Sequence, residues 1–200
     1  MEIGLPSLEF FSRAWASEPL TTALRDVSIP LVLPAPEQNI SLVAIAREEN
    51  RPQITVGQCS MNHVATYWDH VERLDLESLN FPTCIFAAIH KKAAKAEQEY
   101  LHELGIEPKN TLHNAGIAVL PEYRGYGLGI EMAKHQIELC KQLKSPFLFC
   151  ETTNRNSAHI CKQLGFISIA EYSYKSLADE LSCRDLNKLD DFFTIWRTNI

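Results

Sequence analysis

The chain has 200 residues, and this length predicts a single domain over residues 1–200. Apolar residues make up 46 % and charged residues 22 % of the sequence, a balance typical of a globular protein and not of a disordered one. With 19 lysines and arginines against 25 aspartates and glutamates, the net charge is −6. An acidic surface repels phosphate backbones, so the composition argues against nucleic-acid binding, although it permits one local basic pocket for a small anion.

Targeting signals and metal motifs are not found in the sequence. The start, MEIGLPSLEFF, has neither a cationic region nor a long apolar run, so we expect no signal peptide. No stretch approaches the roughly 18 uninterrupted apolar residues of a membrane-spanning helix, so we expect no membrane association. The six cysteines lie in apolar segments, without a CxxC pair or metal-ligand spacing. We therefore expect reduced, buried thiols, no metal site and a cytoplasmic protein.

The first half of the chain predicts helices around a β-hairpin. Residues 5–25 indicate one or two short helices, and prolines at positions 30, 34 and 36 mark an irregular connection. Residues 40–47 and 53–61 have the composition of strands, with a turn between them. Residues 62–111 indicate a helical insertion, in which an apolar stripe lies opposite charged side chains.

The second half alternates strands and helices. Strands are predicted at residues 112–120, 146–151, 166–174 and 191–198. A glycine-rich turn at residues 121–129 leads into a helix, and a second helix at residues 156–164 ends at Gly165. This order predicts an α/β fold with a mixed, partly parallel central sheet flanked by helices.

The glycine-rich turn is the most informative segment. It has the sequence RGYGLG and consists of Arg124, Gly125, Tyr126, Gly127, Leu128 and Gly129. It fits neither the Walker pattern, which needs a Lys-Ser/Thr pair, nor GxGxxG, because Ile130 stands at the third glycine position. Glycines let backbone N–H groups converge on phosphate oxygens, and the following helix adds its positive end. The turn therefore indicates a pyrophosphate site, with a purely structural tight turn as the alternative.

Residues 116–129, GIAVLPEYRGYGLG, closely resemble the acetyl-CoA-binding motif of the GNAT superfamily of N-acetyltransferases. The following NRNS and CKQLGF segments resemble the next motif of that superfamily. The resemblance implies the GNAT fold, with a helical insertion before the cofactor strand, and acetyl-CoA as cosubstrate. It places the pyrophosphate on the backbone of the RGYGLG turn. It also places the pantetheine arm along Ile117 and Val119, and a cofactor contact at Asn154.

A narrower resemblance concerns the acceptor. Glu18-Pro19-Leu20, the long helix before the cofactor strand and the NRNS run are similar to insect-type arylalkylamine N-acetyltransferases. This resemblance implies acetyl transfer, in a ternary complex, to a small arylalkylamine-like primary amine, by a monomer or homodimer. The alternatives are a protein or polyamine acetyltransferase and a non-catalytic acyl-CoA-binding sensor.

Such a reaction needs a base, because an alkylammonium has a pKa of about 10.4 and only about one molecule in two thousand is neutral at pH 7. Glu18 matches the glutamate to which the arylalkylamine group assigns this role; its alternative is a charge that complements a helix dipole. His113 lies six residues before Val119, where histone-acetylating relatives carry a glutamate. A pKa of about 6.5 suits a base, and the alternative is a structural histidine.

The departing thiolate needs a proton, and two candidate donors share one helix face. Ser157 and Cys161 are four residues apart. Many relatives have a tyrosine acid at position 161, so Cys161 departs from the pattern and is interpreted either as the acid or as a small buried side chain. Tyr172 is a further candidate. Four aromatic residues are candidates for an amine pocket, with plain core as the favoured interpretation: Trp15, Tyr67, Trp68 and Phe81.

Overall fold

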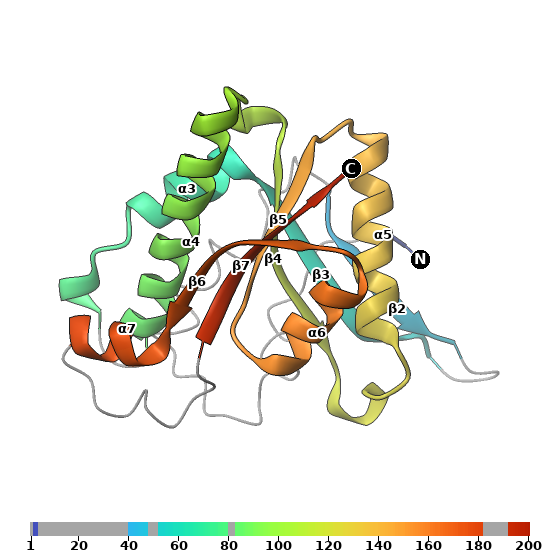
Figure 1. Ribbon diagram of the computed structural model, residues 1–200. Helices are drawn as coiled ribbons and strands as arrows, with labels where there is room; N and C mark the ends of the chain where they lie inside the picture. Colours follow the sequence, from blue (N-terminus) through green and yellow to red (C-terminus); the bar gives the residue numbers. More distant parts are fainter. Residues whose placement is uncertain (1, 4–39, 48–51, 80–82, 182–191) are drawn as a thin grey trace.

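The structure, a computed structural model, describes residues 2–3, 40–47, 52–79, 83–181 and 192–200 (Figure 1). A seven-stranded mixed sheet with the order β1-β2-β3-β4-β5-β7-β6 forms its centre. The strands are β1 Glu2–Ile3, β2 Leu42–Ala46, β3 Ile54–His63, β4 Leu112–Val119, β5 Phe147–Thr152, β6 Ile167–Ser173 and β7 Phe192–Asn199. Neighbouring strands are antiparallel except β4 and β5, which are parallel. The predicted α/β class with a partly parallel sheet is confirmed.

The helices of the described residues are α3 Val64–Glu72, α4 Thr83–Leu104, α5 Leu128–Gln142, α6 Arg155–Gln163 and α7 Tyr174–Glu180. Short 3-10 turns lie at Leu76–Ser78, Pro108–Asn110 and Pro121–Tyr123. The predicted helical insertion before β4 is confirmed as α3 and α4. The helix α7, which the sequence did not indicate, begins after Ser173, whose side chain accepts a hydrogen bond from the Ser176 N–H. The helices predicted over residues 5–25 lie outside the described residues.

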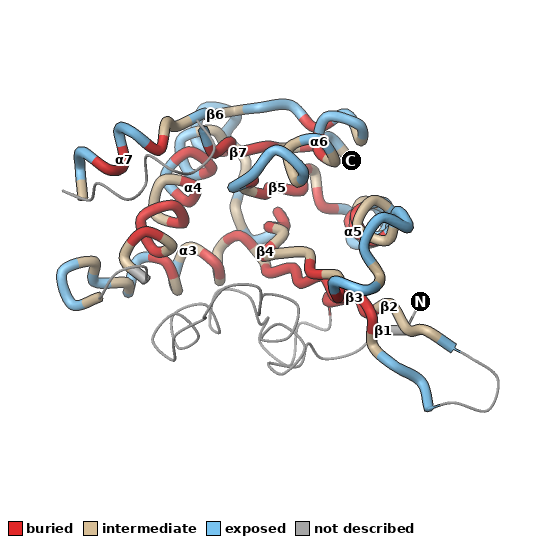
Figure 2. The backbone as a smooth tube through the Cα atoms, turned by 90° about the horizontal axis from the view of Figure 1, so that it is seen from below, coloured by how far each residue is buried: buried red, intermediate tan, exposed pale blue. Residues whose placement is uncertain are grey.

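Strand β5 shows how the helices cover both faces of the sheet. Leu148 and Cys150 pack in a cluster with residues of α5 and α6. Phe147 and Phe149, which alternate with them, pack with residues of α3 and α4. The result is a helix–sheet–helix arrangement whose buried residues run along the central strands and the inner side of α4 (Figure 2).

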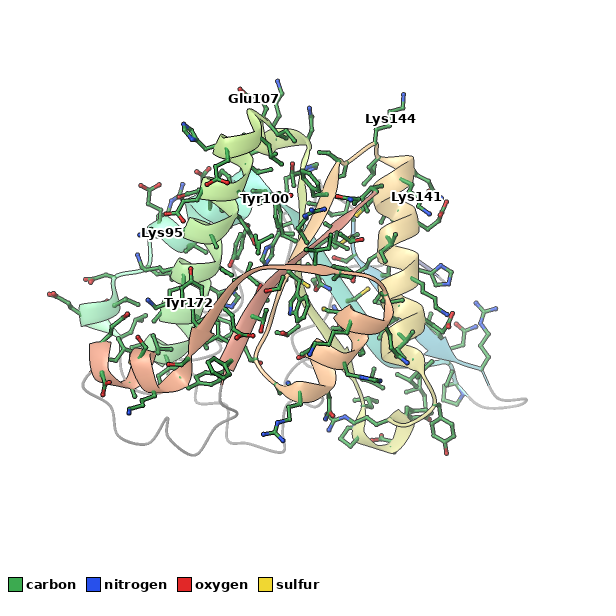
Figure 3. All side chains as sticks on the ribbon, in the orientation of Figure 1. Lys95, Tyr100, Glu107, Lys141, Lys144 and Tyr172 are labelled. Atoms are coloured by element: carbon green, nitrogen blue, oxygen red, sulfur yellow. The ribbon has the colours of Figure 1, made fainter. Side chains whose placement is uncertain are left out.

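The outer sides of the helices are charged. Lys95 on α4 and Lys141 on α5 lie on the outer sides of their helices (Figure 3) and form exposed pairs with Glu99 and Glu138. This arrangement follows the predicted separation of apolar and charged faces. Within the described part of the chain, no helix has both the length and the apolar character needed to cross a bilayer.

Candidate active site

The parallel strands β4 and β5 separate partway along their length. They pair through Leu112, His113 and Asn114, and no further. Two residues on, Gly116 has φ +147°, a conformation that favours glycine, and its N–H donates to Asn114 Oδ1 at 2.7 Å. The register of β4 against β3 shifts at the same place. These local features turn β4 away from β5, and among the residues that the structure describes no strand pairs with the second half of β4 on that side.

A cavity of about 680 Å³ occupies the space between the separated strands. Its wall consists of the second half of β4, the glycine-rich turn, the start of α5, the end of β5 and α6. At the turn, Gly125 and Gly127 have φ values of +84° and +79°, and Gly127 is the N-cap of α5. The Arg124 Nε–H donates to the Val119 carbonyl at 3.0 Å, which ties the turn to the end of β4. The N–H groups that begin α5, which have no helical carbonyl partner, therefore lie at the cavity.

The start of α6 forms another part of the wall. Asn154 is the N-cap, and its Oδ1 accepts from the Ser157 N–H at 3.0 Å. The Ser157 hydroxyl donates to the Asn154 carbonyl at 3.0 Å. One turn later, the Cys161 Sγ lies 3.6 Å from the Cys150 Sγ. The hydrogen bond with Cys161, together with burial, raises the pKa of the Cys150 thiol, so Cys150 is protonated at neutral pH.

Most of the residues predicted to form the site line this cavity: Ile117, Val119, Arg124, Gly125, Gly127, Leu128, Gly129, Asn154, Ser157 and Cys161. Tyr126, predicted in the same turn, is 79 % exposed and is not among the lining residues. Glu18, Trp15 and Phe81 lie outside the described residues. Tyr172 stacks on Phe193 and does not line the cavity.

His113 lies behind the cavity, fully buried between two carboxylates. Its Nδ1 is 2.7 Å from Glu97 Oε1 on α4, and its Nε2 is 3.1 Å from Glu151 Oε2 on β5. Burial by itself would lower the pKa of His113, but the two carboxylates outweigh it and raise the pKa to about 10. The ring is therefore an imidazolium at neutral pH, with no lone pair to accept a proton.

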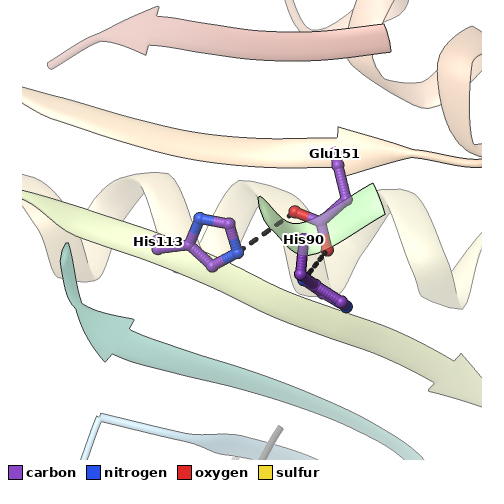
Figure 4. Close-up of side chains that lie close together, drawn as sticks. All are labelled: His90, His113 and Glu151. Carbon is purple, nitrogen blue, oxygen red and sulfur yellow. Dashed lines mark ion pairs between the residues drawn. The ribbon is translucent and has the colours of Figure 1, made fainter. Parts of the chain in front are cut away.

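A second histidine completes this buried polar cluster, which we define as His90, Glu97, His113 and Glu151. His90 Nδ1 lies 3.3 Å from Glu151 Oε1 (Figure 4). Burial lowers the pKa of His90 despite the nearby carboxylate, so this ring is neutral at pH 7. Figure 4 shows Glu151 between the two rings, with each of its oxygens facing a different histidine.

The aromatic residues Tyr67 and Trp68 of α3 support the cluster. The Tyr67 ring stacks on His113 with centroids 3.7 Å apart, and its hydroxyl is 2.9 Å from His90 Nδ1. The Trp68 Nε1–H donates to Glu97 Oε2 at 3.0 Å. Tyr67 and Trp68 belong to the packed core, as the favoured interpretation of the sequence has it.

Glu151 connects the cluster to the cavity. It lines the cavity wall, although its side chain is only 9 % exposed. Burial would raise the pKa of Glu151, but His113 and His90 outweigh burial and lower the pKa to about 2. The carboxylate is therefore ionised at any physiological pH, and the cavity has a fixed negative charge at this point of its wall.

Three residues of the cluster have the types and spacing of metal ligands. The ligand atoms of His90, His113 and Glu151 lie within 4.8 Å of one another. Histidine and glutamate suit zinc, but a ring binds a metal only through a nitrogen that carries no proton. Because the carboxylates stabilise the proton on His113, the geometry is that of an ion-pair network.

Sequence reasoning missed His90, Glu97 and Glu151. The available signal is their position in apolar patterns. His90 and Glu97 are seven residues apart and fall on the buried side of α4 with Ala94 and Leu101. Glu151 directly follows the apolar run PFLFC. A charged residue at a buried position needs a partner, but the pattern does not say which one.

Several solved structures share this fold, although a search of curated protein sequences found no match. Arylalkylamine N-acetyltransferase 2 from Aedes aegypti has a TM-score of 0.70 and 17 % identity, over 98 % of this chain and 97 % of that chain. The C-terminal condensation domain of Ebony, in complex with beta-alanyl-dopamine, has a TM-score of 0.71 and 11 % identity, over 100 % and 98 %. Polyamine N-acetyltransferase of Drosophila melanogaster, which catalyses the formation of N-acetylagmatine, has a TM-score of 0.55 and 13 % identity, over 82 % and 76 %.

Identities this low show that the fold is shared. The family model for the acetyltransferase (GNAT) family matches residues 66–166, about half of the chain. This range contains the separated strands, the glycine-rich turn and all of α6, and it includes the whole buried polar cluster. The chain belongs to the acetyltransferase (GNAT) family.

Proposed function

We propose that the protein transfers the acetyl group of acetyl-CoA to a small primary amine, with arylalkylamines as the leading acceptor class. The observation that carries this proposal is the cavity between β4 and β5, which extends from the N-terminus of α5 to the ionised carboxylate of Glu151. One end suits a pyrophosphate, and the other suits a thioester meeting an amine. On this proposal, acceptor and cofactor would share one cavity with the carboxylate, an arrangement that favours direct transfer within a ternary complex.

The proposed cofactor site uses mainly backbone groups. The N–H groups of residues 124–129 would bind the pyrophosphate, where glycines allow close approach and the helix dipole favours negative charge. The pantetheine arm would pair with the β4 edge at Ile117 and Val119, which β5 leaves free. A backbone N–H near Val119 would stabilise the oxyanion of the thioester carbonyl as the amine attacks.

The candidate proton donors come from the cavity wall, whereas the candidate base comes from the sequence resemblance. Ser157 and Cys161 both line the cavity and are the candidate proton donors for the departing thiolate. For the base, the imidazolium state of His113 favours Glu18, the candidate taken from the arylalkylamine resemblance. On this proposal, Glu18→Gln lowers kcat/KM about 10²-fold, the usual scale for loss of a general base.

The acceptor class draws on the structural neighbours. One is an arylalkylamine N-acetyltransferase and another is bound to beta-alanyl-dopamine. Both align over nearly the whole chain. A polyamine is the second candidate, because the Drosophila neighbour forms N-acetylagmatine.

An amine panel tests the proposed function. The purified chain is incubated with acetyl-CoA and tyramine, tryptamine, agmatine or spermidine, and the release of free thiol is measured. We expect amine-dependent release, fastest with an arylalkylamine, and intersecting double-reciprocal plots as a ternary complex requires. Faster release with agmatine or spermidine would move the assignment to polyamines. Binding of acetyl-CoA without release for any amine would contradict the enzymatic proposal and support an acyl-CoA sensor.

A further inference from the structure

We infer that Glu151 binds the acceptor amine as a cation, through an ion pair with its ammonium group, and that His113, Glu97 and His90 hold the carboxylate in position. The inference rests on the proposed function, because it concerns the acceptor of the same cavity. It makes positive charge at the reacting nitrogen a requirement for binding. It also assigns Glu151 as a substrate-binding residue and the other three as positioning residues.

The place of Glu151 in the sheet supports this assignment. The last pair between the parallel strands joins Asn114 to Cys150, so Glu151 is the first residue of β5 beyond the pairing. Its side chain therefore lies where the two strands separate. A thioester whose pantetheine arm follows β4 toward this point would approach the carboxylate. An ammonium bound to Glu151 would then lie beside the thioester carbonyl, which its nitrogen attacks once the base, for which Glu18 is the candidate, has taken one of its protons.

The charges of the buried polar cluster do not balance. The cluster contains two carboxyl groups, Glu97 and Glu151, but only one histidine whose pKa is raised, His113, because burial lowers the pKa of His90. Within the described part of the chain, the ion pairs of both carboxylates are with histidines and with no lysine or arginine. A buried, uncompensated charge is unfavourable, and an alkylammonium of one positive charge neutralises it.

Glu151 also has the capacity for another hydrogen bond. An ionised carboxylate has about four acceptor positions, and Glu151 directs one oxygen to each histidine. Glu151 is one of the residues that line the cavity, and its remaining acceptor positions suit the N–H donors of an ammonium. The titratable groups near it are Tyr67 of α3, His90 and Glu97 of α4, His113 of β4, and the thiol of Cys150, which itself contacts Cys161.

Matched ligand pairs test this inference by equilibrium binding. The full chain is saturated with CoA, which cannot transfer an acetyl group, and ligand affinities are measured by calorimetry at pH 7.5. Tyramine is compared with 4-ethylphenol, and agmatine with butylguanidine; the second member of each pair lacks the amine. We expect at least tenfold tighter binding of the amine in one pair or both, and loss of this preference in Glu151→Gln. Glu138→Gln, which removes an exposed charge on α5, is the matched control and should keep the preference.

The positioning residues are tested by the same amine preference, which is the ratio of the affinities of the two ligands in each pair. Glu97→Gln should reduce the amine preference by less than Glu151→Gln does, with unchanged CoA affinity, a pattern that a loss of stability alone would not produce. If Glu151→Gln does not fold, Glu151→Asp replaces it. Asp keeps the charge but withdraws it by one methylene, and the preference should fall by a smaller factor.

Two results would overturn the inference. One is a wild-type protein that binds neither amine more tightly than its partner ligand. The other is an undiminished preference in Glu151→Gln or, where that variant does not fold, in Glu151→Asp. If thiol release with amines persists alongside either result, acetyl transfer stands and the ammonium site is refuted. If the preference depends on Glu151 but no amine releases thiol, the cation site stands and the proposed transfer is refuted.

Discussion

The cavity wall and the buried polar cluster lie next to each other but are built in different ways. The wall comes from one stretch of the chain, residues 114–166, largely through backbone conformation and helix starts. The cluster instead joins side chains of α4, β4 and β5, separated by up to 61 positions between His90 and Glu151 (151 − 90). Local backbone features leave a sequence motif, whereas long-range side-chain pairing does not.

The largest expected effect is on the stability of the cluster. His113→Leu leaves two carboxylates without their shared cation, and removal of one partner from a buried ion pair typically costs about 3–5 kcal/mol. We expect a loss of this order in the free energy of unfolding, measured by urea denaturation. Lys95→Ala, which removes one partner of an exposed pair on α4, is the control and should be near wild type. Equal effects from the two variants would mean that the cluster is no more important than a surface pair.

A substitution in the cavity wall should lower the affinity for acetyl-CoA. Gly127→Val places a branched side chain at φ +79° where the pyrophosphate is proposed to approach. We expect at least a tenfold loss of acetyl-CoA affinity by calorimetry. Gly105→Val is the matched control, because Gly105 has φ +64° and a Cβ there also meets no atom within 4 Å. Both variants should lose about 1–2 kcal/mol of stability to left-handed strain, so an affinity loss shared by both would contradict the assigned site.

The pH dependence of stability should distinguish the cluster from the wall. The pKa of His113 rises from 6.5 to about 10 on folding, so its contribution is complete below about pH 6.5 and is lost as the pH rises toward 10. The urea midpoint of the wild type should therefore fall from pH 6.5 to 8. This window lies below the usual range of cysteine titration, so the buried thiols change little in it. His113→Gln should show a flatter profile over the same window, and parallel profiles would show that His113 does not hold its proton more tightly when folded.

Below about pH 4.5, stability should change with pH in the opposite direction, and should fall as the pH falls. The pKa of Glu151 falls from 4.5 to about 2 on folding, so its contribution is present above about pH 4.5 and is lost as the pH falls toward 2. Because Glu151→Gln has no such carboxylate, its urea midpoint should fall less steeply than that of the wild type between pH 4.5 and 3. If the urea midpoints of the two proteins fell equally steeply, the pKa of Glu151 would not be lowered in the folded protein.

The smallest expected effect concerns Cys161 in the wall. Cys161→Ala removes a buried sulfur that contacts Cys150, and we expect a loss of about 1 kcal/mol in stability and little change in kcat. Ser157→Ala is the companion variant, because it removes the other candidate proton donor on the same helix face. A large fall in kcat for Cys161→Ala alone, with unchanged acetyl-CoA affinity, would identify its thiol as the acid.

The sequence by itself determined the strands after residue 111, the helices α5 and α6, and the two local parts of the cavity wall, which are the glycine-rich turn and the start of α6. Gly125 and Gly127 indicate a turn before a helix, and both have positive φ values in the structure. Asn154 indicates a helix start, and it is the N-cap of α6. Both features depend mainly on residues that are close in the sequence. Tyr126 belongs to the same motif, yet only the structure shows that its side chain is exposed.

Only the tertiary structure decided the partners of the buried charges and the position of β7 between β5 and β6. The sequence marks His113 as a candidate base because an isolated imidazole has a pKa near neutrality. Its actual state follows from Glu97 and Glu151, which the fold brings within 2.7 and 3.1 Å of the ring. Protonation depends on the electric field of neighbours in space, and a sequence gives only neighbours along the chain.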